Sequence, residues 1–310
     1  MDKNPLLIIL GPTASGKTKL AVSLAAELNG EVISADSRQV YRGMDIGTGK
    51  DLAEYVYQGN PVPYHLINIR EAGESYNVNS FKDDFYEVFK SLTQQHKLPV
   101  LCGGTGMYIH SILQNQAFTA IPVDQQLRDS LPLGVAEALK ALLTAYPIEL
   151  RAHADLSSAK RMVRAIEVAD YLSKHTLVPE SRPEIHPLII GLTGTVELRR
   201  ERILKRLDTR FEEGLIEEVR TLIAQGVTPE MLIFYGLEYK FVTEYLLKQL
   251  RLDELKEKLY IAIRQFAKRQ MTFFRKMEKD GVEINWFDSA VEPESLKLAI
   301  QQLYKDQFLR

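Results

Sequence analysis

The sequence predicts an α/β fold in which a parallel sheet carries a phosphate-binding loop and a helical insertion separates the sheet-forming segments. An apolar run of β type, Leu6–Leu10, leads directly into a glycine-rich loop and a helix. Further short apolar runs at 32–35, 99–102 and 187–192 have the length of buried strands. Residues 124–185 lack convincing strands and show helical segments over 135–145 and 158–173. Strands alternating with helices favour a parallel sheet.

Length and composition indicate an ordinary globular protein with room for one large domain and a smaller one. Of the 310 residues, 45% are apolar and 26% charged, and the net charge of −2 argues neither for nor against a nucleic-acid partner. No apolar run approaches the roughly 20 residues that span a bilayer, and the N-terminal run is too short for a signal peptide. The single cysteine, Cys102, excludes a disulfide framework and a zinc finger. We therefore expect a cytoplasmic protein without a membrane association.

The clearest motif is a phosphate-binding P-loop, Gly11-Pro12-Thr13-Ala14-Ser15-Gly16-Lys17-Thr18. The glycines let backbone N–H groups wrap a phosphate at a helix N-terminus, where the helix dipole favours negative charge. Lys17 would neutralise phosphate oxygens, and the Thr18 hydroxyl would be a ligand of Mg²⁺, the expected cofactor. The fold class is therefore a P-loop NTPase-like parallel sheet core with a helical insertion domain and a helical C-terminal region. Most such loops bind ATP or a related nucleotide, but a diphosphate ester would fit the same cradle.

Asp36 follows the second predicted strand and should face the loop, since ligands of open α/β sheets bind at the carboxyl edge of the strands. Three roles are open from the spacing alone. Asp36 could bind Mg²⁺, act as a general base, or be a turn aspartate at a strand end.

Several longer blocks carry a family resemblance. They are ISADSRQVYRGMDIGTGK at 33–50, HLINI at 65–69, Tyr76-Asn77-Val78 with Phe81, PVLCGGTGMY at 99–108, Arg161 with RAIEV at 164–168, and RQFAKRQ at 264–270 with Phe274-Arg275. In this order the blocks resemble the signature of the tRNA dimethylallyltransferase (tRNA isopentenyltransferase, IPP transferase) family, bacterial type, over about residues 10–288. The sequence departs from the family pattern at four places, none of them in the loop or at Asp36: Asp51, Asn68, Tyr235-Gly236-Leu237-Glu238 and Ile263.

The resemblance implies transfer of a dimethylallyl group from dimethylallyl diphosphate to the N6 amine of the adenosine 3′ of the anticodon in tRNA, with release of diphosphate. Asp36 would take the proton of the amine, and Lys17 would stabilise the leaving diphosphate. Thr105 would line the reaction channel, although a helix N-cap is its simpler role. Arg210 would be a second cation for the diphosphate, although it could equally be a solvated arginine on a charged helix.

Contacts with the anticodon stem-loop are also implied, and we expect the protein to act as a monomer. The predicted domains are 1–123 for the first part of the core, 124–185 for a tRNA-facing helical insertion, and 186–310 for the rest of the core and the C-terminal helices. A helix over about 253–279 carries an apolar stripe, predicted as core, at Leu255, Leu259, Ala262, Phe266, Phe273 and Met277.

The tRNA-binding residues that the resemblance implies are Asp36, Ser37, Arg38, Gln39, Thr105, Arg128, Lys160, Arg161, Arg164, Arg264, Lys268 and Arg269.

Three other functions compete. An adenylate dimethylallyltransferase, acting on AMP or ATP, would share the loop and Asp36 but have little use for the insertion. A P-loop kinase would need ATP turnover and would make the Gly103-Gly104-Thr105 turn a scaffold. A non-enzymatic RNA-binding protein would not need an intact Lys17, Thr18 and Asp36.

Overall fold

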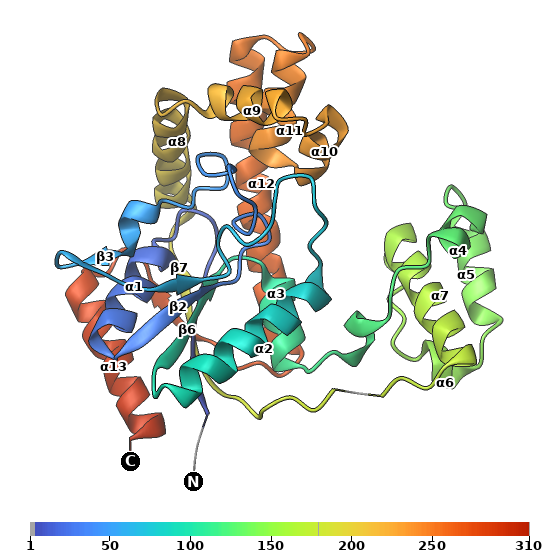
Figure 1. Cartoon of the computed structure of the whole chain (residues 1–310), viewed down its shortest axis with the longest axis horizontal. Coiled ribbons are helices and arrows are strands. Elements are labelled where there is room, and N and C mark those ends of the chain that lie inside the picture. The colour runs from blue at the N-terminus through green and yellow to red at the C-terminus, as the bar shows by residue number, and fades with distance from the viewer. Residues whose placement is uncertain (1–3, 179, 310) are drawn as a thin grey trace. The chain divides into compact units, whose positions relative to one another are not determined.

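The computed structural model describes residues 4–178 and 180–309, which form two compact units (Figure 1). We call them the core unit, which runs up to Leu113 and resumes at Pro183, and the insertion unit, Gln114–Arg182. The predicted insertion of 124–185 therefore begins too late in the sequence. The reason is that residues just before 124 pack inside the insertion unit: the ring of Phe118 lies 4.7 Å from that of His153, and Arg164 donates to the Phe118 carbonyl at 2.9 Å.

The core unit is built on a six-stranded sheet whose hydrogen-bonded pairs are all parallel, as predicted. The order across the sheet is β5-β2-β6-β1-β7-β8. The strands are β1 (Pro5–Leu10), β2 (Gly30–Ser34), β5 (Tyr64–His65), β6 (Leu98–Gly103), β7 (His186–Thr193) and β8 (Asn285–Asp288). A short antiparallel hairpin of β3 (Val56–Tyr57) and β4 (Asn60–Pro61) lies outside the sheet and follows the 3-10 helix η1 (Leu52–Tyr55).

Helices cover both faces of the sheet, because successive side chains of a strand point to opposite faces. Leu6, Ile8 and Leu10 of β1 pack with α2 (Val78–Gln94) and α3 (Gly106–Leu113). Leu7 and Ile9 pack with α1 (Lys17–Glu27) and α13 (Pro293–Phe308) on the other face.

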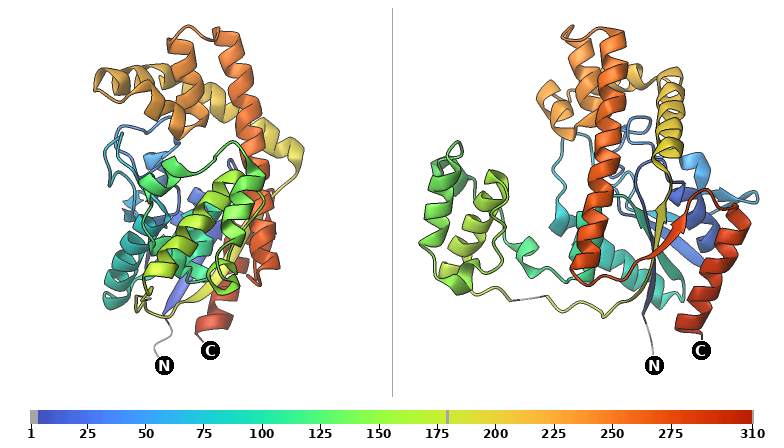
Figure 2. Two further views of the ribbon diagram at one scale, coloured as in Figure 1. Left: turned by 90° about the vertical axis from the view of Figure 1, so that its right-hand side faces the viewer. Right: turned by 180° about the vertical axis from the view of Figure 1, so that it is seen from behind.

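A bundle of helices completes the core unit beyond the carboxyl edge of the sheet. It consists of α8 (Val196–Glu212), α9 (Leu215–Ala224), α10 (Pro229–Tyr235), α11 (Leu237–Leu246) and α12 (Leu252–Lys279). These helices share one buried cluster that includes Leu207, Val219, Tyr239 and Leu259. The long α12 runs from this bundle down to α3 (Figure 2), so it links the bundle to the sheet layer. None of the described helices is long and apolar enough to cross a membrane.

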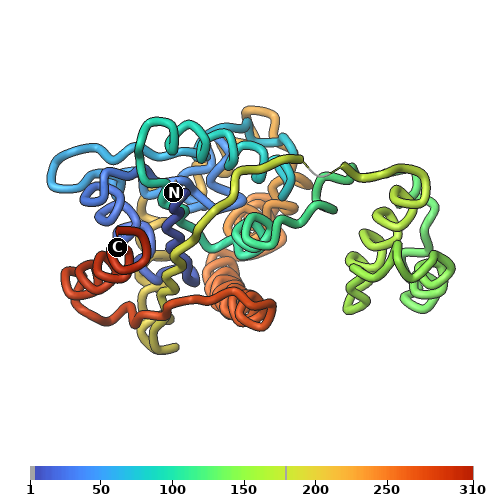
Figure 3. Tube along the Cα trace, turned by 90° about the horizontal axis from the view of Figure 1, so that it is seen from below, coloured from blue at the N-terminus to red at the C-terminus, as the bar shows by residue number. Residues whose placement is uncertain are grey.

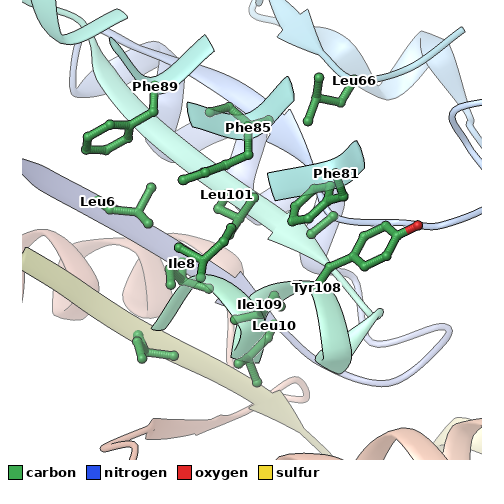
Figure 4. Packing of buried hydrophobic residues seen from close by; sticks show 14 of the residues in the cluster. Leu6, Ile8, Leu10, Leu66, Phe81, Phe85, Phe89, Leu101, Tyr108 and Ile109 are labelled. Carbon is green, nitrogen blue, oxygen red and sulfur yellow. The ribbon is translucent and has the colours of Figure 1, made fainter. Parts of the chain in front are cut away.

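The tube view shows α13, in red, beside α1, in blue (Figure 3). On the opposite face Phe81, Phe85 and Phe89 of α2 lie over Leu6, Ile8 and Leu101 of the sheet (Figure 4). Their spacing of four residues keeps the three rings on one side of the helix. The strands are thus fixed from both faces, which holds the loops at their carboxyl ends in place.

The predicted apolar stripe of α12 is wrong in its middle. Leu255, Leu259 and Met277 are buried, but the other buried positions are Ile263, Ala267, Gln270 and Phe274. Phe266 and Phe273 are half-buried. The side chain of Phe266 lines a pocket with Ile263 and Gln270 instead of packing into the bundle, so polar Gln270 takes a buried place that hydropathy assigned to phenylalanine.

The insertion unit is helical throughout its regular structure. It contains η2 (Ala117–Ala120), α4 (Gln125–Ser130), α5 (Ala136–Thr144), α6 (Ile148–Arg151) and α7 (Ala159–Lys174). Its apolar core joins α5 and α7. The buried carboxylate of Glu167 accepts two hydrogen bonds from Arg128, at 2.7 and 2.8 Å, and one from the backbone of Asp124 at 3.0 Å. Burial alone would raise the pKa of Glu167, but hydrogen bonds from Arg128 and Arg164 outweigh it and hold this pKa below its ordinary value.

We expect Glu167→Gln to destabilise the insertion unit by about 2–3 kcal/mol, because it removes a buried charge that two guanidinium groups need. Since the folded-state pKa is depressed, the contribution of Glu167 is present above its unfolded pKa and is lost as pH falls through the folded pKa. The loss of stability is measured by hydrogen exchange of the α7 amides in Glu167→Gln, compared with the same exchange in the control Glu137→Gln, at an exposed position. Equal protection in both variants would contradict the assigned role.

Candidate active site

The glycine-rich loop has the backbone that anion binding requires. Ala14 and Gly16 adopt left-handed conformations, with φ of 64° and 83°, and the Ser15 N–H donates to the Pro12 carbonyl at 3.2 Å. α1 begins at Lys17 without a side-chain cap. The first N–H groups of a helix have no intrahelical partner, and here no side chain of the N-cap takes their place, so they can donate to an anion at the helix N-terminus.

The strand order brings three loops together. β6 lies between β1 and β2, so the segments after all three strands meet at one edge of the sheet. The fit is close: a Cβ on Gly103 would lie 2.2 Å from the Ala35 carbonyl oxygen. The Thr105 N–H donates to that same oxygen at 3.1 Å. No side chain other than hydrogen fits at 103 without moving the backbone.

Asp36 and Thr105 both stabilise the turn after β2. Asp36 Oδ1 accepts the Arg38 N–H at 3.0 Å, and Thr105 Oγ1 accepts the Ser37 N–H at 3.1 Å. Asp36 is therefore a turn aspartate, yet its carboxylate also lines the pocket described next. Thr105 lies in the loop after the neighbouring strand β6, directly before α3. Its hydroxyl therefore fixes the turn after β2 from the adjacent loop.

A pocket opens where these loops face the bundle. Of the predicted site residues it gathers Thr13, Lys17, Thr18, Asp36, Arg38, Gln39 and Arg210. Gly11, Pro12, Ala14, Ser15, Gly16, Ser37 and Thr105 are not in its lining. The residues that sequence reasoning did not place here are Thr48, Gly49, Tyr55, Cys102, Gly103, Arg206, Leu237, Glu238, Ile263, Phe266 and Gln270.

The pocket wall is cationic. Lys17, Arg38, Arg206 and Arg210 line it, against the two carboxylates of Asp36 and Glu238. Burial lowers the pKa of Lys17, and the guanidinium of Arg206 adds to this while Asp36 opposes it. An excess of positive charge in a partly buried pocket favours a multiply charged anion.

Arg210 and Arg206 pack against a glycine. A Cβ on Gly49, where φ is 61°, would lie 1.9 Å from Arg210 Nη2 and 2.1 Å from Arg206 Nη2. Burial, with Arg206 contributing, lowers the pKa of Arg210 to about 10, so Arg210 stays charged at neutral pH. Within the described residues its buried Nε has no hydrogen-bond partner. Arg210 is therefore not the solvated arginine that its charged helix also allowed.

Glu238 holds two of these cations. It is 2% exposed, and its two oxygens accept from Arg38 Nη1 at 2.8 Å and from Arg210 Nη1 at 2.6 Å. Burial alone would raise the pKa of Glu238, but the charges of Arg38 and Arg210 hold it below its ordinary value.

α12 supplies the polar clamp and the apolar wall. Gln270 Oε1 accepts the Thr13 N–H at 2.8 Å, and its Nε2 donates to the Gly104 carbonyl at 3.0 Å. One turn and two turns earlier, Phe266 and Ile263 line the same pocket. The guanidinium of Arg38 lies 5.7 Å from the Phe266 ring centroid. The pocket can thus hold a polyanion beside a carboxylate and an apolar surface.

Two of the four departures from the family pattern lie at this pocket, although none falls in the glycine-rich loop or replaces Asp36. Leu237, Glu238 and Ile263 line the pocket. Asp51 pairs with Arg206 at 2.7 Å. Asn68 accepts from Lys50 away from the pocket. No local pattern in the sequence indicates the role of Glu238, because its partners lie 28 and 200 positions away.

In the described residues no group of three or more His, Cys, Asp or Glu side chains could hold a metal ion. A magnesium ion bound to substrate phosphates needs few protein ligands, usually oxygens. The Thr18 hydroxyl and the Asp36 carboxylate supply such oxygens in the pocket, so the residues present fit Mg²⁺.

The remaining predicted tRNA-binding residues fall into two sets. In the insertion unit, Arg128 and Arg164 are engaged with Glu167, and Arg161 pairs with Asp155 at 2.8 Å; Lys160 and Arg161 are exposed. On α12, Lys268 and Arg269 are exposed, and Arg264 lies over the Tyr260 ring. Arg128 and Arg164 therefore stabilise the insertion unit, and phosphate binding by any of these residues stays a prediction.

Comparisons with known proteins cover nearly the whole chain. The family model described as IPP transferase matches residues 39–277, and the model described as isopentenyl transferase matches residues 4–68. The chain is 48% identical to tRNA dimethylallyltransferase 1 of Parabacteroides distasonis over 99% of its length and 100% of the relative. It is 47% identical to tRNA dimethylallyltransferase 2 of Bacteroides fragilis over 99% and 100%.

Solved structures agree. A tRNA isopentenylpyrophosphate transferase from Bacillus halodurans superposes with a TM-score of 0.71 at 31% identity, covering 98% of this chain and 97% of that one. A eukaryotic dimethylallyltransferase acting on tRNA shares the fold, with a TM-score of 0.72 at 21% identity over 92% of this chain and 74% of that one. With the glycine-rich loop, Asp36 and Thr105 at one edge of the sheet, a family model over residues 39–277 and curated bacterial relatives matched over 99% of the chain, the chain belongs to the IPP transferase family, the tRNA dimethylallyltransferases.

Proposed function

We propose that this protein transfers a dimethylallyl group from dimethylallyl diphosphate to the N6 amine of the adenosine 3′ of the anticodon in tRNA. The observation that carries the proposal is the pocket in which the phosphate loop, Asp36 and the apolar side chains of Ile263 and Phe266 meet. A diphosphate ester of a branched five-carbon chain matches this mixture of cationic and apolar surface. The full-length likeness to tRNA dimethylallyltransferases supports tRNA, and not a free adenine nucleotide, as the acceptor.

In the proposed reaction N6 attacks the allylic carbon, the bond from that carbon to oxygen breaks, and its electron pair leaves with the diphosphate. Lys17, Arg206, Arg210 and the loop N–H groups stabilise the charge that grows on the leaving group. Asp36 accepts the proton of the amine. The apolar wall keeps water from the partly cationic allylic carbon.

Mg²⁺ is proposed as the cofactor, with the Thr18 hydroxyl as its protein ligand, and when bound it would neutralise diphosphate charge. The acceptor base must leave its stack to reach a pocket at the sheet edge, which a single-stranded anticodon loop permits at modest cost. We further propose that the protein acts as a monomer in the cytoplasm.

The direct test is transfer of labelled dimethylallyl diphosphate to total bacterial tRNA, with AMP and ATP as parallel acceptors. We expect label in tRNA alone. Label in AMP or ATP would instead identify an adenylate dimethylallyltransferase, and the absence of label in all three would refute prenyl transfer.

Asp36→Asn should lower kcat by about 10²–10⁴-fold, because the amide cannot take a proton. The amide oxygen can still accept the Arg38 N–H, so the turn and the affinity for tRNA should be retained. Single-turnover transfer and tRNA filter binding measure the two quantities. Turnover like that of the wild type would rule out Asp36 as the base.

Lys17→Ala should raise the KM for dimethylallyl diphosphate and lower kcat/KM by about 100-fold, as loss of one donor to developing charge does elsewhere. Lys19→Ala is the matched control, because Lys19 lies on the same helix with its side chain 74% exposed. Equal kinetics for both variants would show that the loop does not bind the diphosphate.

Replacing Lys160 and Arg161 together by alanine should weaken tRNA binding and make its salt dependence less steep. The slope of log K against log salt should shrink by about 0.7–0.9 for each tRNA phosphate that the two side chains neutralise. Lys140→Ala, at another exposed lysine of the insertion unit, is the control. An unchanged slope in the double variant would assign this surface to solvent.

A further inference from the structure

Glu238 is brought into the pocket by an unusual stretch of backbone. It follows Gly236 and Leu237, which have φ of 75° and 44°. A left-handed leucine is disfavoured and persists only where the surrounding structure requires it. Here it starts α11 so that Leu237 and Glu238 both reach the pocket.

The carboxylate of Glu238 is shared between two arginines from distant segments. One oxygen accepts from Arg38, after β2, and the other from Arg210, on α8. The side chains of all three are mostly buried, with 2% exposure for Glu238, 7% for Arg210 and 16% for Arg38. Such a buried charge is tolerated only with its partners in place, so the positions of the two guanidinium groups depend on each other.

The two arginines face different parts of the pocket. Arg210 stands with Arg206 against Gly49, and its buried Nε has a hydrogen that no described residue accepts. An anion that reaches this side chain would satisfy the donor with a charge-assisted hydrogen bond. Arg38 belongs to the turn that Asp36 caps and lies over the ring of Phe266. It is therefore next to the group that takes the proton of the acceptor amine.

We propose that Glu238 is a positioning residue that couples the binding of the diphosphate to the binding of the tRNA. This proposal rests on the proposed function. A ligand that fixes Arg210 also fixes Glu238, and Glu238 then fixes Arg38. The second ligand meets an arginine that is already ordered and so binds more tightly. Because coupling is reciprocal, each substrate raises the affinity for the other by the same factor.

The test measures the dissociation constant of an anticodon stem-loop RNA with and without saturating inorganic diphosphate and Mg²⁺. For the wild type we expect diphosphate to tighten RNA binding by at least about 5-fold, the lower end of typical couplings. In Glu238→Gln the neutral amide cannot hold both cations, and the ratio should fall to about 1. The affinity for diphosphate with and without RNA should change by the same factor.

Glu218→Gln is the matched control. Glu218 is also a carboxylate of the bundle with several partners, the N–H groups of Asp45, Ile46 and Gly47 and the Tyr239 hydroxyl, but it does not line the pocket. Its loss should lower the melting temperature and leave the ratio unchanged. If Glu238→Gln does not fold, Glu238→Asp keeps the charge on a side chain too short to span both arginines, and its ratio should also fall to about 1.

A wild-type ratio of 1, or a wild-type ratio in the foldable Glu238 variant, would overturn the coupling. A ratio that falls equally in Glu218→Gln would overturn it too, because it would reflect general loosening of the bundle. Failure of the proposed function looks different, because wild-type protein would then transfer no label to tRNA. If the wild type transfers label to tRNA but shows a ratio of 1, the proposed function stands and only the coupling through Glu238 is refuted.

Discussion

The close approach of β6 to the end of β2 governs the geometry of the whole site. Gly103 has no room for a side chain beside the Ala35 carbonyl, and this contact places the Thr105 backbone and hydroxyl against the turn that carries Asp36. Because β6 also pairs with β1, the same strand sets the distance from Asp36 to the phosphate loop. A carboxylate and a phosphate cradle on two strands that do not touch are thus held in register by a third.

What the sequence could predict is what depends on neighbours along the chain. The phosphate loop needs only its own residues and the strand and helix that flank it, and the prediction of its setting is confirmed. Asp36 could be placed at the carboxyl edge because strand direction alone determines that edge. Its use in the turn, with the Arg38 N–H as partner, is one of the three roles that the spacing leaves open.

The parts that sequence reasoning misses depend on contacts between distant segments. Glu238 is charged, which predicts exposure. Its burial is possible only because it pairs with Arg38, in the turn after β2, and with Arg210, on α8. Gln270 is missed for the same reason. The predicted stripe on α12 is wrong in its middle because hydropathy assigns phenylalanine to the core, whereas Phe266 lines the pocket. Gln270 is buried instead, and its hydrogen bonds to the Thr13 N–H and the Gly104 carbonyl compensate for the loss of water.

Gln270 also limits how the phosphate loop can bind. Its Oε1 takes the Thr13 N–H, so that donor is not open to a phosphate while α12 is in place. The Ser15 N–H donates to the Pro12 carbonyl, so the N–H groups that the loop can offer an anion are that of Ala14 and those from Gly16 toward the start of α1, where the dipole of the helix adds to them. The other end of the same amide holds the Gly104 carbonyl, next to Thr105. A shift of α12 would therefore alter the phosphate loop and the Thr105 turn together. Since α12 also supplies Ile263 and Phe266 to the pocket, the helix that shapes the apolar wall also sets which donors the glycine-rich loop can offer an anion.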